Sequence, residues 1–153
     1  MRVFYQCYGR AHTSIVAAHL HLGNLPVETR PTVREIMSLP YFDRARETDI
    51  GQPLLLGRDR DGHEIFALGL GMGIRQGLGA LCSVLRTGGE EEPLVVNTLK
   101  GLGLVARLGG GLSRELGLVA VGRPLVAHGV VKIFPRLVRT VDEVKAVLRE
   151  IVS

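Results

Sequence analysis

Short apolar runs alternate with segments of helical periodicity along the chain. Each apolar run is rich in β-branched or aliphatic residues and leads into glycine or small polar residues, a pattern that predicts strands followed by loops and helices. Two of the runs are separated by Asp61-Gly62, the dipeptide of a tight hairpin turn. The strands predicted in this way are residues 2–7, 94–97 and 118–121, together with the antiparallel pair Leu54–Leu56 and Glu64–Leu68.

Capping signals mark the ends of the predicted helices. Gly23 suits the left-handed cap that ends the first helix. Two Thr-x-x-Glu capping boxes predict helix starts further along the chain. They are Thr32 with Glu35, before a short helix at residues 33–39, and Thr140 with Glu143, before a closing helix with apolar residues at helical spacing.

Strands that alternate with helices predict an α/β fold. We expect a single α/β domain over residues 1–153, in three layers, with a mostly parallel sheet, helices on both faces and one β-hairpin. Such an architecture is P-loop-like or Rossmann-like. A chain of 153 residues suffices for one hydrophobic core. A glycine-rich helix pair is expected at residues 98–117, and the long irregular stretch at residues 41–52 is interpreted as a lid or partner loop.

Glycine is unusually frequent, and positive charge is concentrated near the end of the chain. Glycine accounts for 20 of 153 residues, about 13% against a usual value near 7%. Residues 98–153 hold nine Lys and Arg but only four Asp and Glu. This excess favours small anions or an acidic surface as partners. The lack of Lys/Arg runs interleaved with aromatic residues argues against nucleic acid.

Several classes of protein are disfavoured by the apolar segments and the cysteines. No apolar h-region follows the first residues, so we expect no secretory signal and a cytoplasmic protein. The most apolar stretch, residues 65–85, is interrupted by Arg75 and Gln76, so we expect no transmembrane segment. Cys7 and Cys82 are too isolated for a disulfide framework or a zinc cluster. The sequence therefore predicts free thiols, and it identifies neither a metal site nor a cofactor.

Four predicted strand-to-helix junctions bring glycine or small polar residues together with a basic residue. In α/β sheets, ligands bind at the carboxyl ends of parallel strands, where helix N-termini present N–H groups to anions. Junctions that lie side by side would form one anion site. The alternative is that the glycines only allow tight turns and close packing. The anion-binding residues predicted at these junctions are Gly9, Arg10, Thr13, Ser14, Gly71, Gly73, Arg75, Lys100 and Arg123.

The first junction also carries two candidate catalytic residues. His12 lies beside hydroxyls at a helix N-terminus, which favours the neutral imidazole of a general acid or base; the alternative is a histidine that bonds the backbone. Cys7 is a candidate nucleophile at a strand end, and the alternative is a core residue. A phosphate loop of the form GxxxxGKS/T is not present, because Gln6 and Ala11 stand where glycines belong. A switch-like or motor-like NTPase is therefore disfavoured.

The remaining histidines and paired acidic residues have structural interpretations. His19 and His21 fall on different faces of the first helix, which disfavours a joint metal site. Asp59 and Asp61 resemble a calcium loop, but the further ligands and the closing Glu are missing. A hairpin turn explains them better, and His63 in the same hairpin is interpreted as structural.

Four segments of the chain carry the motifs of one protein family. They are Tyr8–Ser14 (YGRAHTS), Leu39–Asp43 with Asp49–Pro53 (LPYFD and DIGQP), the hairpin Gly57–Glu64, and Gly110–Val126. Together they resemble an uncharacterised bacterial family, a domain of unknown function that occurs mainly in spore-forming Gram-positive bacteria. The resemblance covers nearly the whole chain and implies no activity. It draws attention to Gly9 and to polar residues that burial alone would not require, which are His12, Ser14, Asp43, Asp49, Ser113, Arg114 and Arg123. Arg114 joins the expected anion-binding set.

These observations favour a domain that binds a phosphorylated or otherwise anionic small molecule, nucleotides included. Arg10, Thr13 and Ser14 would hold the anion, the other basic residues of the junctions would neutralise its remaining charge, and His12 would transfer a proton. One alternative is a non-catalytic interaction protein, linked to sporulation, whose basic last third docks on a partner or an anionic membrane. A second alternative is a small Cys7-dependent phosphohydrolase. Both an enzyme and a binding module fit these residues.

Overall fold

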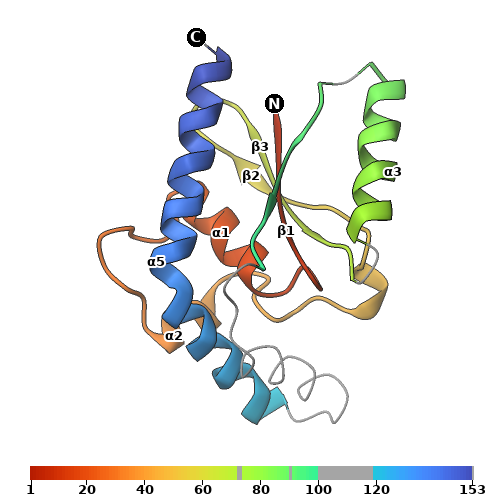
Figure 1. Ribbon diagram of the computed structural model, residues 1–153. Helices are drawn as coiled ribbons and strands as arrows, with labels where there is room; N and C mark the ends of the chain where they lie inside the picture. Colours follow the sequence, from red (N-terminus) through yellow and green to blue (C-terminus); the bar gives the residue numbers. More distant parts are fainter. Residues whose placement is uncertain (72–73, 90, 100–118, 153) are drawn as a thin grey trace.

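A four-stranded sheet forms the centre of the fold (Figure 1). The computed structural model describes residues 1–71, 74–89, 91–99 and 119–152. The strands are β1 (Arg2–Cys7), β2 (Leu54–Arg58), β3 (Glu64–Gly69) and β4 (Leu94–Asn97), in the order β2-β3-β1-β4. β1 pairs in parallel with β3 and β4, whereas β2 pairs antiparallel with β3. β1 is therefore an interior strand, and both of its neighbours run in its direction.

Helices lie on both sides of this sheet. They are α1 (Thr13–His21), α2 (Val33–Ser38), α3 (Ile74–Thr87) and α5 (Val119–Val152), with a short 3-10 helix, η1 (Glu47–Asp49). α1 and α5 pack on one face and α3 on the other (Figure 1). α2 packs against α5.

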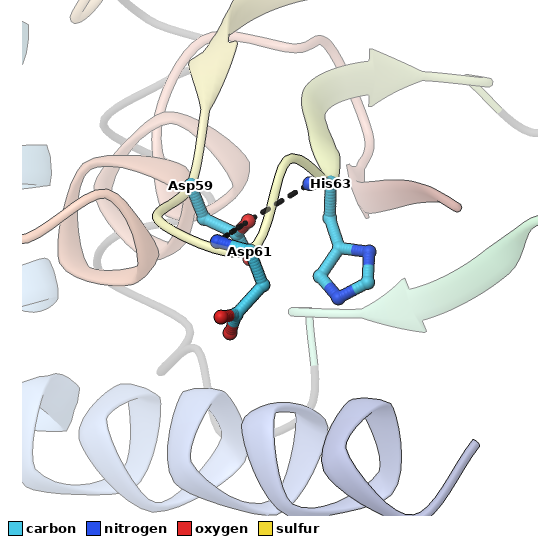
Figure 2. Close-up of side chains that lie close together, drawn as sticks. All are labelled: Asp59, Asp61 and His63. Carbon is cyan, nitrogen blue, oxygen red and sulfur yellow. Dashed lines mark hydrogen bonds between the residues drawn. The ribbon is translucent and has the colours of Figure 1, made fainter. Parts of the chain in front are cut away.

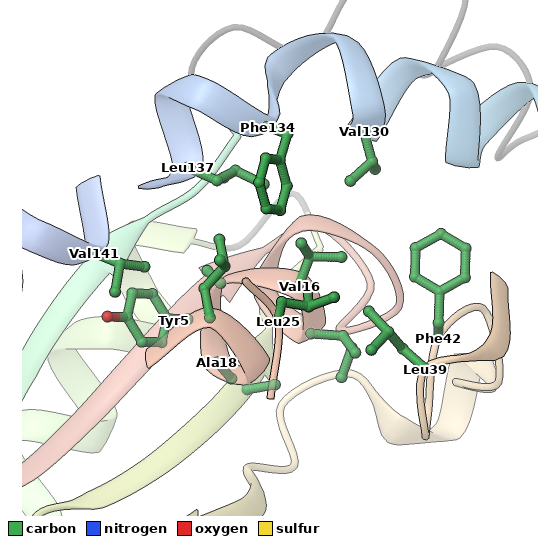
Figure 3. Packing of buried hydrophobic residues seen from close by; sticks show 14 of the residues in the cluster. Tyr5, Val16, Ala18, Leu25, Leu39, Phe42, Val130, Phe134, Leu137 and Val141 are labelled. Carbon is green, nitrogen blue, oxygen red and sulfur yellow. The ribbon is translucent and has the colours of Figure 1, made fainter. Parts of the chain in front are cut away.

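The side chains of β1 alternate between two apolar clusters, because successive residues of a strand point to opposite faces. Val3 and Tyr5 belong to the larger cluster, which Phe134 of α5 helps to close (Figure 3). Phe4 points to the α3 side and stacks on Phe66, its partner in β3, with ring centroids 4.7 Å apart. The strand that carries the first junction is thus buried on both faces, as is usual for parallel strands.

Local sequence signals predicted most of these elements. The strands at residues 2–7 and 94–97 and the antiparallel hairpin are confirmed. The capping box of α2 is confirmed as well, because the Thr32 hydroxyl accepts a hydrogen bond from the Glu35 N–H and the Glu35 carboxylate accepts one from the Thr32 N–H. The α/β class with its hairpin is therefore confirmed, in the form of a mixed four-stranded sheet.

The end of α1 also follows its predicted signal. Gly23 has a φ of 76°, a left-handed conformation that favours glycine. The N–H groups of Gly23 and Asn24 donate to the carbonyls of Leu20 and His19, at 3.1 and 2.9 Å. These two bonds close the helix in the usual left-handed motif.

The end of the chain differs from the prediction, because α5 is one continuous helix. Residues 119–121, expected to end a strand, form its first turn, and Leu118 lies outside the described residues. A short apolar run fits either a strand or a buried helix, and here the apolar positions from Val126 to Leu148 form one buried helical stripe. The capping box predicted at Thr140 is wrong, since this residue lies inside α5. The closing helix itself is confirmed.

Two further predictions concern membrane spans and the glycine-rich helix pair. No helix in the described ranges combines the length and the apolar character needed to cross a membrane. The helix pair expected at residues 98–117 lies, from residue 100 onward, outside the described residues.

Two histidines of α1, His19 and His21, are buried and have different hydrogen-bond partners. His21 accepts a hydrogen bond at Nδ1 from the Tyr5 hydroxyl at 2.7 Å and donates from Nε2 to Asp59 Oδ2 at 3.1 Å. His19 donates from Nε2 to the Pro40 carbonyl at 3.2 Å. Burial lowers the pKa of both histidines. The folded protein therefore resists protonation of either ring.

We expect the free energy of unfolding to fall as the pH is lowered from 7.5 to 5.5. In the unfolded chain both histidines titrate near the ordinary value of about 6.5, so below that pH the unfolded state binds protons that the folded state does not, and stability falls. Urea unfolding at both pH values measures this. His19→Gln, which keeps an amide donor but does not titrate, should reduce the loss, whereas His128→Gln on the exposed face of α5 should not. Stability that is constant or rises toward pH 5.5 would contradict this explanation.

Candidate functional site

The loop of residues 8–12, which we call the first loop, connects β1 to α1 at the carboxyl end of the sheet. It lies directly against the end of β3. A Cβ atom built on Gly69 would lie 2.5 Å from the backbone nitrogen of Arg10 and 2.7 Å from the carbonyl carbon of Gly9. The Gly71 N–H also donates to the Tyr8 carbonyl at 2.8 Å. Glycine at position 69 thus permits the contact that places the first loop.

The first loop meets the segment of residues 41–52, and the backbone is strained where they meet. Arg10, Tyr41 and Asp43 have φ values of 56°, 65° and 55°, in the left-handed region that residues other than glycine seldom adopt. The Asp43 N–H donates to the Ala11 carbonyl at 2.8 Å. Such strained residues tend to cluster at functional sites, which directs attention to this contact.

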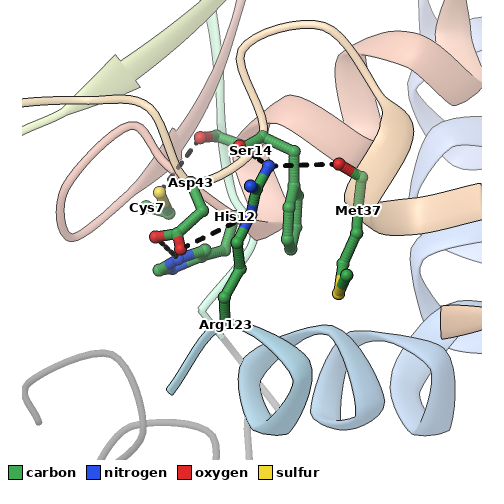
Figure 4. A network of polar contacts seen from close by, with 7 residues as sticks. Cys7, His12, Ser14, Met37, Asp43 and Arg123 are labelled. Atoms are coloured by element: carbon green, nitrogen blue, oxygen red, sulfur yellow. Dashed lines mark hydrogen bonds and ion pairs between the residues drawn. The ribbon is translucent and has the colours of Figure 1, made fainter. Parts of the chain in front are cut away.

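His12, Asp43 and Arg123 form a polar network at this contact (Figure 4). His12 Nε2 lies 2.9 Å from Asp43 Oδ1, and Arg123 Nε lies 3.9 Å from Asp43 Oδ2. The Arg123 guanidinium also donates to the carbonyls of Met37 and Phe42, at 3.1 and 3.3 Å. The Asp43 side chain is 7% exposed and that of His12 is 16% exposed. A largely buried carboxylate thus holds an imidazole that solvent still reaches.

This geometry assigns a role to each nitrogen of His12. A carboxylate only accepts hydrogen bonds, so Nε2 carries the proton that it donates to Asp43. In the neutral ring Nδ1 is then an acceptor, and within the described part of the chain it has no hydrogen-bond partner. An imidazole oriented by a carboxylate, with its other nitrogen free, is the arrangement of a general base.

Arg10 connects the first loop to the far end of the 41–52 segment. Its guanidinium donates to the Gln52 carbonyl at 2.9 Å and lies 3.0 Å from Asp49 Oδ2. Its Nε is buried and has no partner among the described residues. The pKa of Asp49 is lowered, first by the hydrogen bond from the Arg46 N–H and further by the Arg10 charge. With Asp43 at one end and Asp49 at the other, the segment is held to the first loop at both ends.

The hydroxyls at the start of α1 are engaged with neighbouring strands. Ser14 Oγ lies 3.0 Å from the Cys7 sulfur, and Thr13 Oγ1 lies 2.9 Å from Thr98 Oγ1, just beyond β4. The N-cap residue of α1, His12, makes no side-chain cap, and the first turn contains no acidic residue. The helix N-terminus therefore keeps backbone N–H groups that no side chain caps, which is the condition for anion binding.

Many of the predicted site residues come together around the first loop. Gly71 reaches it through its bond to Tyr8, and Arg123 reaches it from inside α5 rather than from a strand-to-helix junction, which corrects the expected origin of that side chain. The basic residues Arg10 and Arg123 are paired with carboxylates and carbonyls. The residues brought together are Cys7, Gly9, Arg10, His12, Thr13, Ser14, Gly71 and Arg123.

Some predicted residues are not placed, and others were not predicted as site residues. Three of the predicted residues, Gly73, Lys100 and Arg114, lie outside the described residues. Arg75 lies in the first turn of α3, and the structure describes only its backbone. Asp43 had no predicted role in the site, although it is the last residue of the LPYFD motif. Met37 and Phe42 contact Arg123 through their backbone carbonyls. The Phe42 ring also lies against the ring of His12, with the two centroids 5.5 Å apart.

Fold and site together define an α/β domain with a carboxylate-held histidine at the carboxyl end of an interior parallel strand. The model of the family described as "Protein of unknown function (DUF3189)" matches residues 2–146. The chain belongs to this family, and the resemblance to a family of unknown function is confirmed. Comparison with curated proteins found no match, and comparison with solved structures found none either.

We expect Gly69→Ala to destabilise the fold, because the added methyl would overlap the backbone of Arg10 and Gly9. Forcing atoms into packed space costs about 1–3 kcal/mol, and urea unfolding measures the loss. Gly79→Ala in α3 is the matched control, since an added Cβ there meets nothing within 4 Å. It should raise stability by up to about 1 kcal/mol through helix propensity. Equal effects of the two substitutions would refute the close contact at Gly69.

Proposed function

We propose that this protein binds a phosphorylated or otherwise anionic small molecule, nucleotides included, at the first loop and the first turn of α1. The observation that carries the proposal is the His12–Asp43–Arg123 network beside an uncapped helix N-terminus. The N–H groups and the dipole of a helix N-terminus attract anions. A general base beside a bound anion adds the means for proton transfer.

The place of the site in the sheet supports the same proposal. β3 and β4 flank β1 on opposite sides and run parallel to it. The chain that leaves β1 leads toward β2, and the chain that leaves β3 leads toward β4, so the first loop lies where these connections run to opposite edges of the sheet. In open α/β sheets this is the usual position of a ligand. The same arrangement, with α1 and α5 on one face and α3 on the other, supports our proposal of a three-layer architecture similar to P-loop or Rossmann domains.

Arg10 is the cation best placed to contact the ligand. The Arg10 side chain extends from the first loop, is 11% exposed, and binds an aspartate whose side chain is 26% exposed. A ligand phosphate would replace the Asp49 carboxylate in this pair and gain charge-assisted hydrogen bonds. Arg123 has a different role, because it neutralises Asp43 and holds the carbonyls of residues 37 and 42. Arg123 is therefore a positioning residue for His12.

A docking function remains the second candidate, supported by the outer face of α5. Lys132, Arg136 and Arg139 are exposed and lie at the spacing that places residues on one helix face. No ion pair joins them to another residue in the ranges the structure describes. This basic face fits an acidic partner or an anionic membrane, and such binding falls with increasing salt.

The Cys7-dependent phosphohydrolase has weaker support from the geometry. The Cys7 side chain is buried and its sulfur bonds the Ser14 hydroxyl. A nucleophilic cysteine reacts as an accessible thiolate. Cys7→Ser that keeps full phosphatase activity would exclude this function, whereas loss of a measured activity would favour it.

We expect a thermal-shift screen at low salt to find an anion that stabilises the protein. The screen compares pyrophosphate, nucleotides, coenzyme A and phosphorylated sugars. A ligand present at 100 times its dissociation constant adds about 2.7 kcal/mol, which raises the melting temperature of a chain of this size by about 5–10 °C. Arg10→Ala should abolish the rise. Arg60→Ala, which removes the same charge from the exposed hairpin, should leave the rise intact.

A third variant tests the role of Arg10 separately. Asp49→Asn weakens the internal ion pair and should tighten anion binding about three- to tenfold, whereas Glu47→Gln in the same short helix should not. The absence of a shift with every anion would contradict the proposed function. Salt-sensitive binding to anionic vesicles that Lys132→Ala and Arg136→Ala weaken would then favour docking through α5.

A further inference from the structure

The turn between β2 and β3 gathers three side chains of metal-ligand type at the end of the sheet opposite the first loop. Asp59, Asp61 and His63 each offer one ligand atom, and these atoms all lie within 4.8 Å of one another (Figure 2). The backbone of the turn is folded around Asp59, whose Oδ1 accepts hydrogen bonds from the N–H groups of Asp61 and His63 at 3.0 and 2.8 Å. The two carboxylates and the imidazole are thereby held together by the turn itself.

The His63 ring lacks the partners that other buried histidines of this chain have. The residue is 6% exposed, and its Nδ1 is buried with no hydrogen-bond partner among the described residues. By contrast, both ring nitrogens of His19 and of His21 are hydrogen-bonded. A buried polar group without a partner is uncommon, because its desolvation is not offset. Nδ1 lies on the side of the ring away from the two aspartates, and Nε2 is the nitrogen nearer to them (Figure 2). Among the described residues Nε2 has no hydrogen-bond partner either, so it is available as a metal ligand.

Asp59 is held by residues behind it in the core. Its Oδ2 accepts a hydrogen bond from His21, which in turn accepts one from the Tyr5 hydroxyl. Support of this kind orients the ligands of metal sites. Asp61 is exposed and is free to complete the site. Binding would draw the three ligand atoms slightly closer together, because metal–ligand bonds near 2.1 Å place ligand atoms no more than about 4.2 Å apart.

We propose that Asp59, Asp61 and His63 bind one divalent transition-metal ion of the Zn²⁺ class. One imidazole nitrogen with carboxylate oxygens suits zinc and its neighbours, whereas magnesium and calcium sites are built from oxygen alone. Three protein ligands leave positions for water. The ion would tie the hairpin turn to the Tyr5–His21 pair in the core. This site is separate from the first loop and is independent of the proposed anion binding.

The test uses the full chain without an affinity tag, freed of metal by dialysis against a chelator. Calorimetric titration with ZnCl₂ at pH 7.5 should show one ion per chain, and the melting temperature should rise. Asp61→Asn and His63→Gln should each weaken binding at least about tenfold. His128→Gln removes an exposed histidine of α5 and should leave binding unchanged. Asp61→Asn keeps the backbone of the turn, so circular dichroism should show it folded even if His63→Gln is not.

Titration with CoCl₂ provides a second readout. Visible bands of bound Co²⁺ without a thiolate charge-transfer band would support the site, because none of its ligands is a cysteine. A thiolate band would place the metal on Cys7 or Cys82 and overturn the proposal. Failure of the wild-type chain to bind Zn²⁺, or binding that a folded Asp61→Asn protein retains at full strength, would also overturn it.

Discussion

The backbone contact between Gly69 and the first loop is the constraint on which the candidate site depends. β1 and β3 are neighbouring parallel strands whose ends lie side by side, and only a residue without a side chain lets the chain leave β1 across the end of β3. This contact fixes where His12 stands and where α1 begins. The larger apolar cluster then buries α1 against α5, so the start of the helix cannot shift without loss of core packing.

Two carboxylates fasten the 41–52 segment to this fixed loop. Asp43 binds Ala11 through its N–H and His12 through its side chain, and Asp49 binds Arg10. The first interaction is largely buried, whereas the Asp49 carboxylate is partly exposed. Buried charge-assisted hydrogen bonds are stronger than exposed ion pairs. The Asp43 end is therefore the anchor, and the Asp49 end is the one that an anionic ligand would release.

Sequence signals that act over a few residues predicted their structures well. The Thr32 capping box, the Gly23 helix end and the Asp61-Gly62 hairpin each depend on backbone bonds within a short span. The first loop was recognised for the same reason, since strand, glycine and helix follow one another directly. In physical terms, these features are set by local hydrogen bonding and allowed φ values, which a single segment specifies.

Features that depend on distant segments were missed. Residues 119–121 have a composition that suits a strand, and only packing of α5 on the core makes them helical. Asp43 pairs with His12 across 31 positions of sequence, and no local pattern specifies such a pair. Arg123 lies inside α5, where the sequence had predicted the junction between a strand and a helix. The resemblance to the family named Asp43 and Arg123 as noteworthy polar residues, but the contact between them required the folded chain.

The central claim is that the first loop and the first turn of α1 bind an anion. Amide chemical shifts of isotope-labelled protein, recorded during titration with pyrophosphate, test it most directly because they locate binding without an activity assay. We predict the largest shifts at the amides of Gly9 to Ser14, with smaller shifts at Asp43 and Asp49. Shifts confined to α5 around Lys132 and Arg136, or no shifts at all, would contradict the claim.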